Sequence, residues 1–187
     1  MIMDGVRNPY EVADALQEIV DDVTGKMKTF HRLFTFSLDP SAVSTLDEAG
    51  EVFNGNFSTR FAGWDIGFWA SGPKSEIAVD QLVFDGTSSQ FIGNTAEKLE
   101  KRRLLGSQFL AICRDHPNQL VDGTGANLFV LTSADEEVSP DMKNVFIARV
   151  IVGGMNENFA LYAFLEQFLD DVAWGGNAKN RLFSPQR

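Results

Sequence analysis

The segment NENFALYAFLEQFLDDVAW, residues 156–174, decides the expected fold because it closes the chain's series of elements with a strong apolar pattern. Its apolar residues recur at helical spacing and precede Gly175; they are Leu161, Leu165, Phe168, Leu169 and Val172. Apolar residues three or four apart line one face of a helix, and glycine often follows the last turn. The segment therefore predicts an amphipathic helix as the last element of a domain.

The first elements are predicted from caps and from a change of period. Asn8 can cap a helix and Pro9 suits its first turn, so residues 8–25 predict an amphipathic helix. Residues 26–38 then alternate with a period of two, which is typical of a strand. The residues expected on one face of that strand are Phe30, Phe34, Phe36 and Leu38. Residues 39–56 contain a short inserted helix that ends near Gly50.

The middle of the chain predicts two hairpins around a long helix. Residues 57–70 and 75–84 are β-rich and flank a turn over residues 71–74. Asn94 and Glu97 form a capping box, which predicts a central helix that ends before Pro117. A glycine-rich loop over residues 122–125 precedes strands at 127–132 and 145–152, which we expect to pair antiparallel.

The resulting order is α-β-(α)-β-β-α-β-β-α, with the inserted helix in parentheses. Hairpin connections imply an antiparallel sheet with helices packed against it, so the expected class is α+β rather than a doubly wound parallel fold. A length of 187 residues suits one domain. We expect this domain over residues 1–176, followed by a polar C-terminal tail over residues 177–187.

Composition limits the partners and the compartment. The chain has 26 acidic and 16 basic residues, a net charge of -10, which disfavours binding to a phosphate backbone. The start, MIMDGVRNPYEVADA, lacks the basic and apolar pattern of a signal peptide, and no later apolar run is long enough to insert into a membrane. The single Cys113 excludes an internal disulfide and suits a reducing compartment. We therefore expect a cytoplasmic protein.

The order of elements and four segments carry a resemblance to a known family. The segments are RRLLGSQFL at 102–110, ANLFVLT at 126–132, VFIARVIV at 145–152 and FALYAFLEQFLDDVAW at 159–174. They resemble the class I type III secretion chaperones, the Tir chaperone family of small acidic cytosolic bacterial proteins. The resemblance covers residues 9–174 in topology and residues 99–174 in sequence detail. The chain departs from the family in its length, in the insertion at 39–56 and in its aromatic hairpin.

The resemblance implies a non-enzymatic protein that keeps a secreted effector soluble and secretion-competent by binding an extended segment of it. It implies no cofactor and no metal. It implies a homodimer joined through the central helix and the following strand, at Leu105, Phe109, Ile112, Leu128 and Val130. The side chains expected to contact the effector are Phe30, Phe34, Phe36, Trp64 and Phe68. Shallow apolar pockets and a free strand edge suit such a role.

Three other classes of function are compatible with the sequence. Cys113 and His116 have the spacing of neighbours on one helix face and could pair as nucleophile and base, but no recognisable oxyanion loop accompanies them. The same pair supplies too few ligands for a zinc site, which usually needs about four. An acidic inhibitor or immunity protein would instead mask a folded partner, and a sensory domain would enclose a small molecule.

Overall fold

The computed structural model describes residues 30–39, 46–54, 56, 74–82, 86–123, 125–133, 136–153, 160–168, 173–174 and 179–186. Its helices and strands are, in chain order, β1 (Phe30–Leu38), α2 (Leu46–Val52), β2 (Ser75–Leu82), β3 (Gly86–Thr87), α3 (Ser88–Ile92), α4 (Ala96–Arg102), α5 (Gly106–Asp115), η3 (Pro117–Gln119), β4 (Asn127–Thr132), β5 (Val145–Gly153), β6 (Ala160–Gln167), β7 (Ala173–Trp174) and β8 (Arg181–Pro185). The helix predicted over residues 8–25 and the strand predicted over 57–70 lie outside the described residues.

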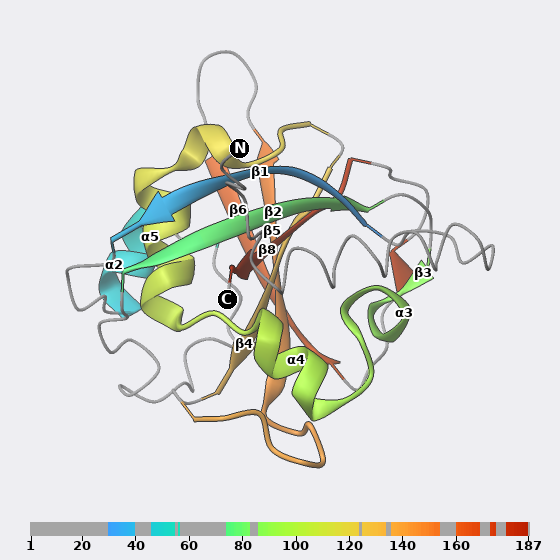
Figure 1. The fold of residues 1–187 in the computed structure, drawn as a ribbon. Helices are drawn as coiled ribbons and strands as arrows, with labels where there is room; N and C mark the ends of the chain where they lie inside the picture. Colours follow the sequence, from blue (N-terminus) through green and yellow to red (C-terminus); the bar gives the residue numbers. More distant parts are fainter. Residues whose placement is uncertain are drawn as a thin grey trace, which may run out of the picture.

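Six strands form one sheet in the order β1-β2-β8-β4-β5-β6 (Figure 1). Every neighbouring pair is antiparallel except β4 and β8, which are parallel. The short strands β3 and β7 pair separately. The prediction of an α+β fold is confirmed, with a sheet that is mostly antiparallel. The hairpin predicted for residues 127–132 and 145–152 is confirmed as β4 and β5.

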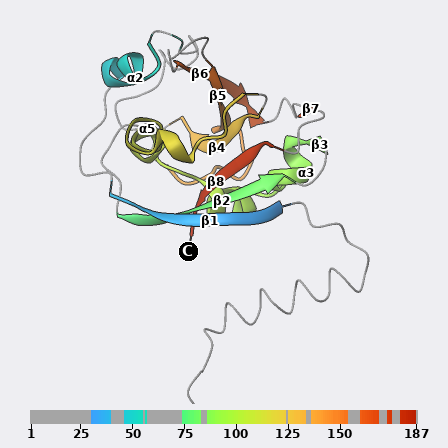
Figure 2. The same ribbon diagram turned by 90° about the horizontal axis from the view of Figure 1, so that it is seen from above.

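The sheet is covered by helices on both faces. α5 lies on the inner side of the curved sheet, between β1 and β5 (Figure 2). Its residues Phe109–Cys113 join one buried cluster with inward side chains from the sheet. α3 and α4 cover the opposite face, where Phe91 and Leu99 pack with Leu128 and Leu182 in a second cluster. The two faces therefore each bury an apolar layer, as both sides of a central sheet require.

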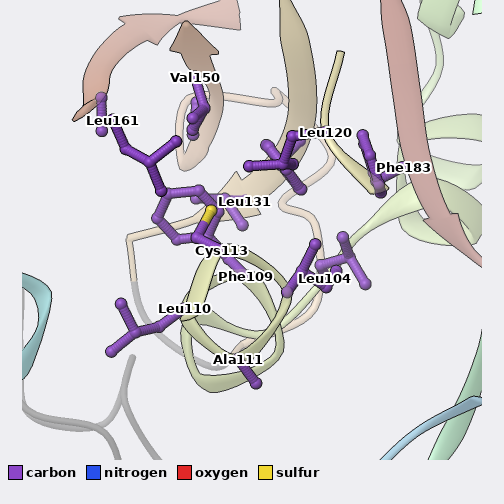
Figure 3. Packing of buried hydrophobic residues seen from close by; sticks show 14 of the residues in the cluster. Leu104, Phe109, Leu110, Ala111, Cys113, Leu120, Leu131, Val150, Leu161 and Phe183 are labelled. Atoms are coloured by element: carbon purple, nitrogen blue, oxygen red, sulfur yellow. The ribbon is translucent and has the colours of Figure 1, made fainter. Parts of the chain in front are cut away.

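A row of four buried phenylalanines runs through the inner cluster. Phe53 stacks on Phe109 with ring centroids 5.8 Å apart, and Phe109 meets Phe129 edge-on at 5.0 Å. Phe129 in turn stacks on Phe183 at 4.8 Å. Figure 3 shows Phe109 and Phe183 among the side chains packed around α5. Because each ring is fully buried, the row ties the segment after α2 to α5, β4 and β8.

The long central helix expected from residue 94 to residue 117 is two helices, α4 and α5. The break lies at Arg103–Leu105, because Arg103 bridges Val130 of β4 and Leu104 N donates to the Val130 carbonyl at 2.9 Å. These backbone groups therefore serve the sheet rather than a helix. α4 also begins one residue later than predicted, with Thr95 as its cap. Within the described residues, no helix is long and apolar enough to cross a membrane.

The helix predicted over residues 156–174 is wrong, because residues 160–167 form the strand β6. Burial along β6 has a period of two, with Leu161, Ala163 and Leu165 buried and Tyr162 and Phe164 exposed. Leu161 and Leu165 are four residues apart and so fit both a helix face and a strand face. The antiparallel partner β5 supplies the backbone hydrogen bonds and decides for the strand.

The predicted polar tail is also wrong, because residues 181–185 form β8 in the interior of the sheet. β8 pairs antiparallel with β2 and parallel with β4. Leu182 and Phe183 are 0% exposed, and they face opposite sides of the sheet. Leu182 and Phe183 are two apolar residues in a polar segment, so their pattern is too short to predict a strand. A strand with neighbours on both sides nevertheless buries both residues, one on each face of the sheet.

We predict that Phe183→Ala lowers the free energy of unfolding by about 3–5 kcal/mol, because it removes a fully buried ring from the phenylalanine row. Urea unfolding followed by circular dichroism measures this loss. Gln186→Ala is the matched control, since Gln186 is exposed just beyond β8 and its backbone hydrogen bond does not need the side chain. Equal stability of the two variants would contradict the position of β8.

Candidate functional site

β1 is an edge strand of the sheet and carries three of the predicted effector-binding residues, Phe30, Phe34 and Phe36. Among the described residues its one strand neighbour is β2. His31, Thr35 and Ser37 are exposed along it, whereas Leu38 is buried at its end. An edge strand leaves one row of backbone donors and acceptors without a sheet partner, and such a row can pair with another chain.

The direction of the backbone groups in β2 follows from two hydrogen bonds to the β8 side. Gln186 N donates to the Glu76 carbonyl at 2.7 Å, and Leu82 N donates to the Asn180 carbonyl at 2.9 Å. Backbone groups alternate sides along a strand, so the even-numbered residues of β2 face β8. The odd-numbered residues of β2 therefore face β1.

The same alternation assigns the open groups of β1. Phe34 and Phe36 pair with odd-numbered residues of β2, so their N–H and C=O groups point into the sheet. Thr35 lies between these two residues and Ser37 follows Phe36. The N–H and C=O groups of Thr35 and Ser37 therefore point away from β2. Among the described residues neither has a backbone partner on that side. The edge therefore presents two donors and two acceptors to a further strand.

Two of the predicted effector-binding side chains lie together beside this edge. Phe34 and Phe36 are half-buried against the inner cluster, with ring centroids 6.5 Å apart. The ring of Phe36 lies 4.8 Å from that of His116, which caps the C-terminal end of α5. The guanidinium of Arg181 lies 5.9 Å from the ring centroid of Phe34. The inner side of β1 is thus an aromatic surface with a cation at one end.

Phe30 does not share this surface, which corrects the prediction that Phe30, Phe34 and Phe36 face one way. The pairing of β1 with β2 slips between Arg32 and Phe34, and the extra residue reverses the faces on either side of it. Phe30 therefore packs against Phe91 of α3 on the outer face, with centroids 6.3 Å apart. The guanidinium of Arg102 lies 4.9 Å above its ring.

Charged side chains surround Phe30 on the outer face of the sheet. Asp80 of β2 is 7% exposed and forms an ion pair with Arg32 of β1. Burial lowers the pKa of the Arg102 guanidinium, and the nearby carboxylate of Asp80 opposes that shift. This face is therefore filled by the protein's own side chains, and the aromatic surface on the inner side is the one that remains half-open.

A polar cavity of about 280 Å³ lies next to the aromatic surface. Its lining residues are Gln81, Val121, Asp122, Lys179 and Arg181. Arg181 belongs to both places, because it lines the cavity and its guanidinium lies near the Phe34 ring. Its Nη1 donates to the Gln119 carbonyl at 2.8 Å, which holds the side chain in position.

Two buried amides, Asn127 and Asn180, hold backbone segments next to the cavity lining. Asn127 is 0% exposed; its Oδ1 accepts from Val121 N at 2.8 Å, and its Nδ2 donates to the Val121 carbonyl at 3.1 Å. Asn180 Oδ1 accepts from Ala126 N at 2.9 Å. At Gly125 a Cβ would come within 2.7 Å of the Val121 side chain, so the loop packs closely only with glycine there. Sequence reasoning missed this cavity because it assigned Lys179 and Arg181 to a tail.

The opposite edge strand, β6, is less open than β1. Ala163 N on its outer side already donates to the Asn56 carbonyl at 2.9 Å. The exposed ring of Phe164 lies 5.1 Å from the guanidinium of Arg149, whose Nη2 pairs with Glu166 Oε1 at 3.2 Å. β1 is therefore the better edge for an added strand.

The predicted dimer interface lies inside the chain. Phe109, Ile112, Leu128 and Val130 are each 0% exposed, and only Leu105 is half-buried. The first four are core residues of a single chain, and this fold leaves them no surface for a second copy. The spacing of these residues in the sequence correctly indicated that they lie on apolar faces of a helix and a strand. In the structure those faces contact the chain's own sheet and helices. The predicted binding residues Trp64 and Phe68 lie outside the described residues.

Cys113 and His116, the residues considered as nucleophile and base, lie in different environments. Cys113 is 2% exposed in the inner cluster, and burial raises the pKa of its thiol. His116 instead lies half-buried against Phe36. A thiol held protonated is a poor nucleophile. Within the described residues, no group of three or more His, Cys, Asp or Glu side chains is placed to hold a metal ion.

Comparison of the chain with protein-family models, with curated proteins and with solved structures finds no match. The case for a function therefore rests on the β1 edge, the aromatic surface and the polar cavity.

We predict that Cys113 resists thiol reagents in the folded protein, because its pKa is raised and its side chain is buried. Ellman's reagent should modify it slowly in buffer and rapidly in urea at the same pH. Fast modification of the folded protein would instead indicate an accessible thiolate and would reopen the nucleophile hypothesis.

Proposed function

We propose that this protein binds an extended segment of a partner polypeptide along the open edge of β1. The observation that supports this most directly is the outward direction of the backbone groups of Thr35 and Ser37 on an edge strand. A segment that pairs with these groups becomes the next strand of the sheet. In this mode main-chain hydrogen bonds supply affinity for many sequences, and side-chain contacts select among them.

The side-chain contacts expected for such a segment come from the inner face of β1. An added strand lies roughly 4.8 Å from its neighbour, and its side chains alternate between the two faces. Those on the inner face would lie beside Phe34 and Phe36, which are half-buried and keep part of their rings accessible. Apolar side chains at alternate positions of the partner are therefore favoured, because they would cover apolar ring surface.

Several features restrict pairing to this short stretch. The slip in pairing between Arg32 and Phe34 disrupts the regular edge towards its N-terminal end, and Arg32 places a charge there. The net charge of -10 opposes association of the protein with its own copies. An edge that is open but limited can accept a partner segment without promoting unlimited sheet growth.

The biological role proposed for this binding is that of a secretion chaperone. A partner whose segment is held extended on β1 is kept from folding and from aggregating, which is what a bacterial effector awaiting export requires. A cytosolic location belongs to the same proposal and rests on the acidic composition and the single cysteine. One chain provides the whole edge, so this mode of binding does not require a homodimer.

Peptide display on the full chain tests the proposal. A random library of roughly 12-residue peptides is panned against the protein, since about 5 or 6 residues make a typical strand. Thr35→Pro should weaken the selected peptides at least about tenfold, because it removes an outward N–H and places a ring at the edge. Proline at an outward-facing position of an edge strand leaves the bonds to β2 intact, so the fold should survive.

Thr35→Ala is the matched control, because it changes the same side chain and keeps the backbone donor. Hydrogen exchange supplies a second readout: a bound peptide should slow exchange at the amides of Thr35 and Ser37, whereas those of Phe34 and Phe36 already face β2. Peptides that bind the proline and alanine variants equally, or a panning that selects none, would overturn the proposal.

Phe36→Ala should weaken the same peptides about tenfold, because it removes a partly exposed side chain worth roughly 1–2 kcal/mol of apolar contact. Fluorescence anisotropy with a labelled peptide measures the change. The unfolding free energy should fall by less than for Phe183→Ala, since Phe36 is only partly buried. Full peptide affinity in a folded Phe36→Ala protein would exclude the aromatic surface from the binding site.

A further inference from the structure

The polar cavity beside Phe34 is lined by more basic than acidic residues, although the chain as a whole is acidic. Two cationic residues and one carboxylate line it, namely Lys179, Arg181 and Asp122, in a protein whose net charge is -10. Fields from an acidic surface favour basic partners, whereas a cationic lining recognises a carboxylate. The cavity therefore selects for a group that the rest of the surface repels.

Arg181 extends this cationic lining to the binding edge. It lies on β8, two strands away from β1 in the sheet, yet its guanidinium reaches to 5.9 Å from the ring centroid of Phe34. Gln81, another lining residue, pairs directly with His31 of β1. An inner-face side chain of a segment paired with Thr35 and Ser37 would lie beside Phe34, on the side of the sheet where the Arg181 guanidinium approaches that ring.

The cavity is large enough and firm enough to hold a side chain. Its volume of about 280 Å³ is far above the roughly 10–15 Å³ that a cavity needs to admit one water molecule. The hydrogen bond from Arg181 to the Gln119 carbonyl uses one of the five guanidinium N–H groups and fixes its position. Asn127 and Asn180 hold backbone segments next to the lining in place. Little reorganisation is required when a ligand enters, which favours affinity.

We propose that this cavity receives an acidic side chain of the segment bound on β1, and that Arg181 and Lys179 recognise its carboxylate. This inference rests on the proposed function and narrows it to a class of partner. The segment would carry an aspartate or glutamate near its apolar positions, with the acid beside Arg181 and the apolar side chains on Phe34 and Phe36. Asp122 would repel the same carboxylate. Loss of a positive charge from the lining should therefore weaken binding, whereas loss of the Asp122 charge should strengthen it.

The test uses peptides selected on the full chain and three single variants. Lys179→Gln should weaken peptide binding about fivefold or more, because one charge-assisted contact is lost. Asp122→Asn should strengthen it, since a repelling carboxylate becomes a neutral amide of the same size. Lys101→Gln is the matched control: it removes the same charge from an exposed lysine of α4 that pairs with Glu97. It should leave binding unchanged.

The selected peptides provide an independent readout. An aspartate or glutamate should be enriched at one position, and its replacement by the amide should cost about as much as Lys179→Gln, with no further loss when both changes are combined. The inference is overturned if Thr35→Pro abolishes binding but Lys179→Gln and Lys101→Gln behave alike. It is also overturned if free glutamate binds the cavity while the acid in the peptide is dispensable. If Thr35→Pro has no effect, the proposed function itself fails.

Discussion

The contact of Phe129 with Phe183 is the interaction on which the rest of the structure depends. The two residues face each other across the parallel pair β4 and β8, with rings stacked 4.8 Å apart and fully buried. β8 is also the strand that joins the β1–β2 half of the sheet to the β4–β5–β6 half. Burial of these rings therefore holds two halves together that are distant in sequence, through a strand near the end of the chain.

The geometry of the candidate site also depends on β8. Because β8 lies beside β2, Arg181 projects over the inner face and reaches Phe34, and Lys179 lines the cavity just before the strand begins. The backbone direction of β2, and through it the open groups of Thr35, is fixed by hydrogen bonds to the β8 segment. The edge, the aromatic surface and the cavity thus depend on one arrangement of strands.

The predictions from sequence succeeded where a local pattern had one interpretation and failed where it had two. β4 and β5 are short apolar runs bounded by turns, and they form the expected hairpin. Leu161 and Leu165 fit both a helix and a strand, and pairing with β5 decided for the strand. Phe34 and Phe36 were placed correctly together, but the slip beside Arg32 turned Phe30 to the other face. That slip depends on the partner strand and leaves no local signal.

The sequence by itself determined the α+β class, the strands of strongest alternation and the acidic character of the surface, because period, turn residues and charge are local properties. Only the tertiary structure decided that residues 181–185 form an interior strand, that Phe109 and Val130 are core residues, and that Arg181 meets Phe34. These outcomes depend on hydrogen bonds and burial between distant segments. Spacing shows which side chains share a face, whereas only packing shows what covers that face.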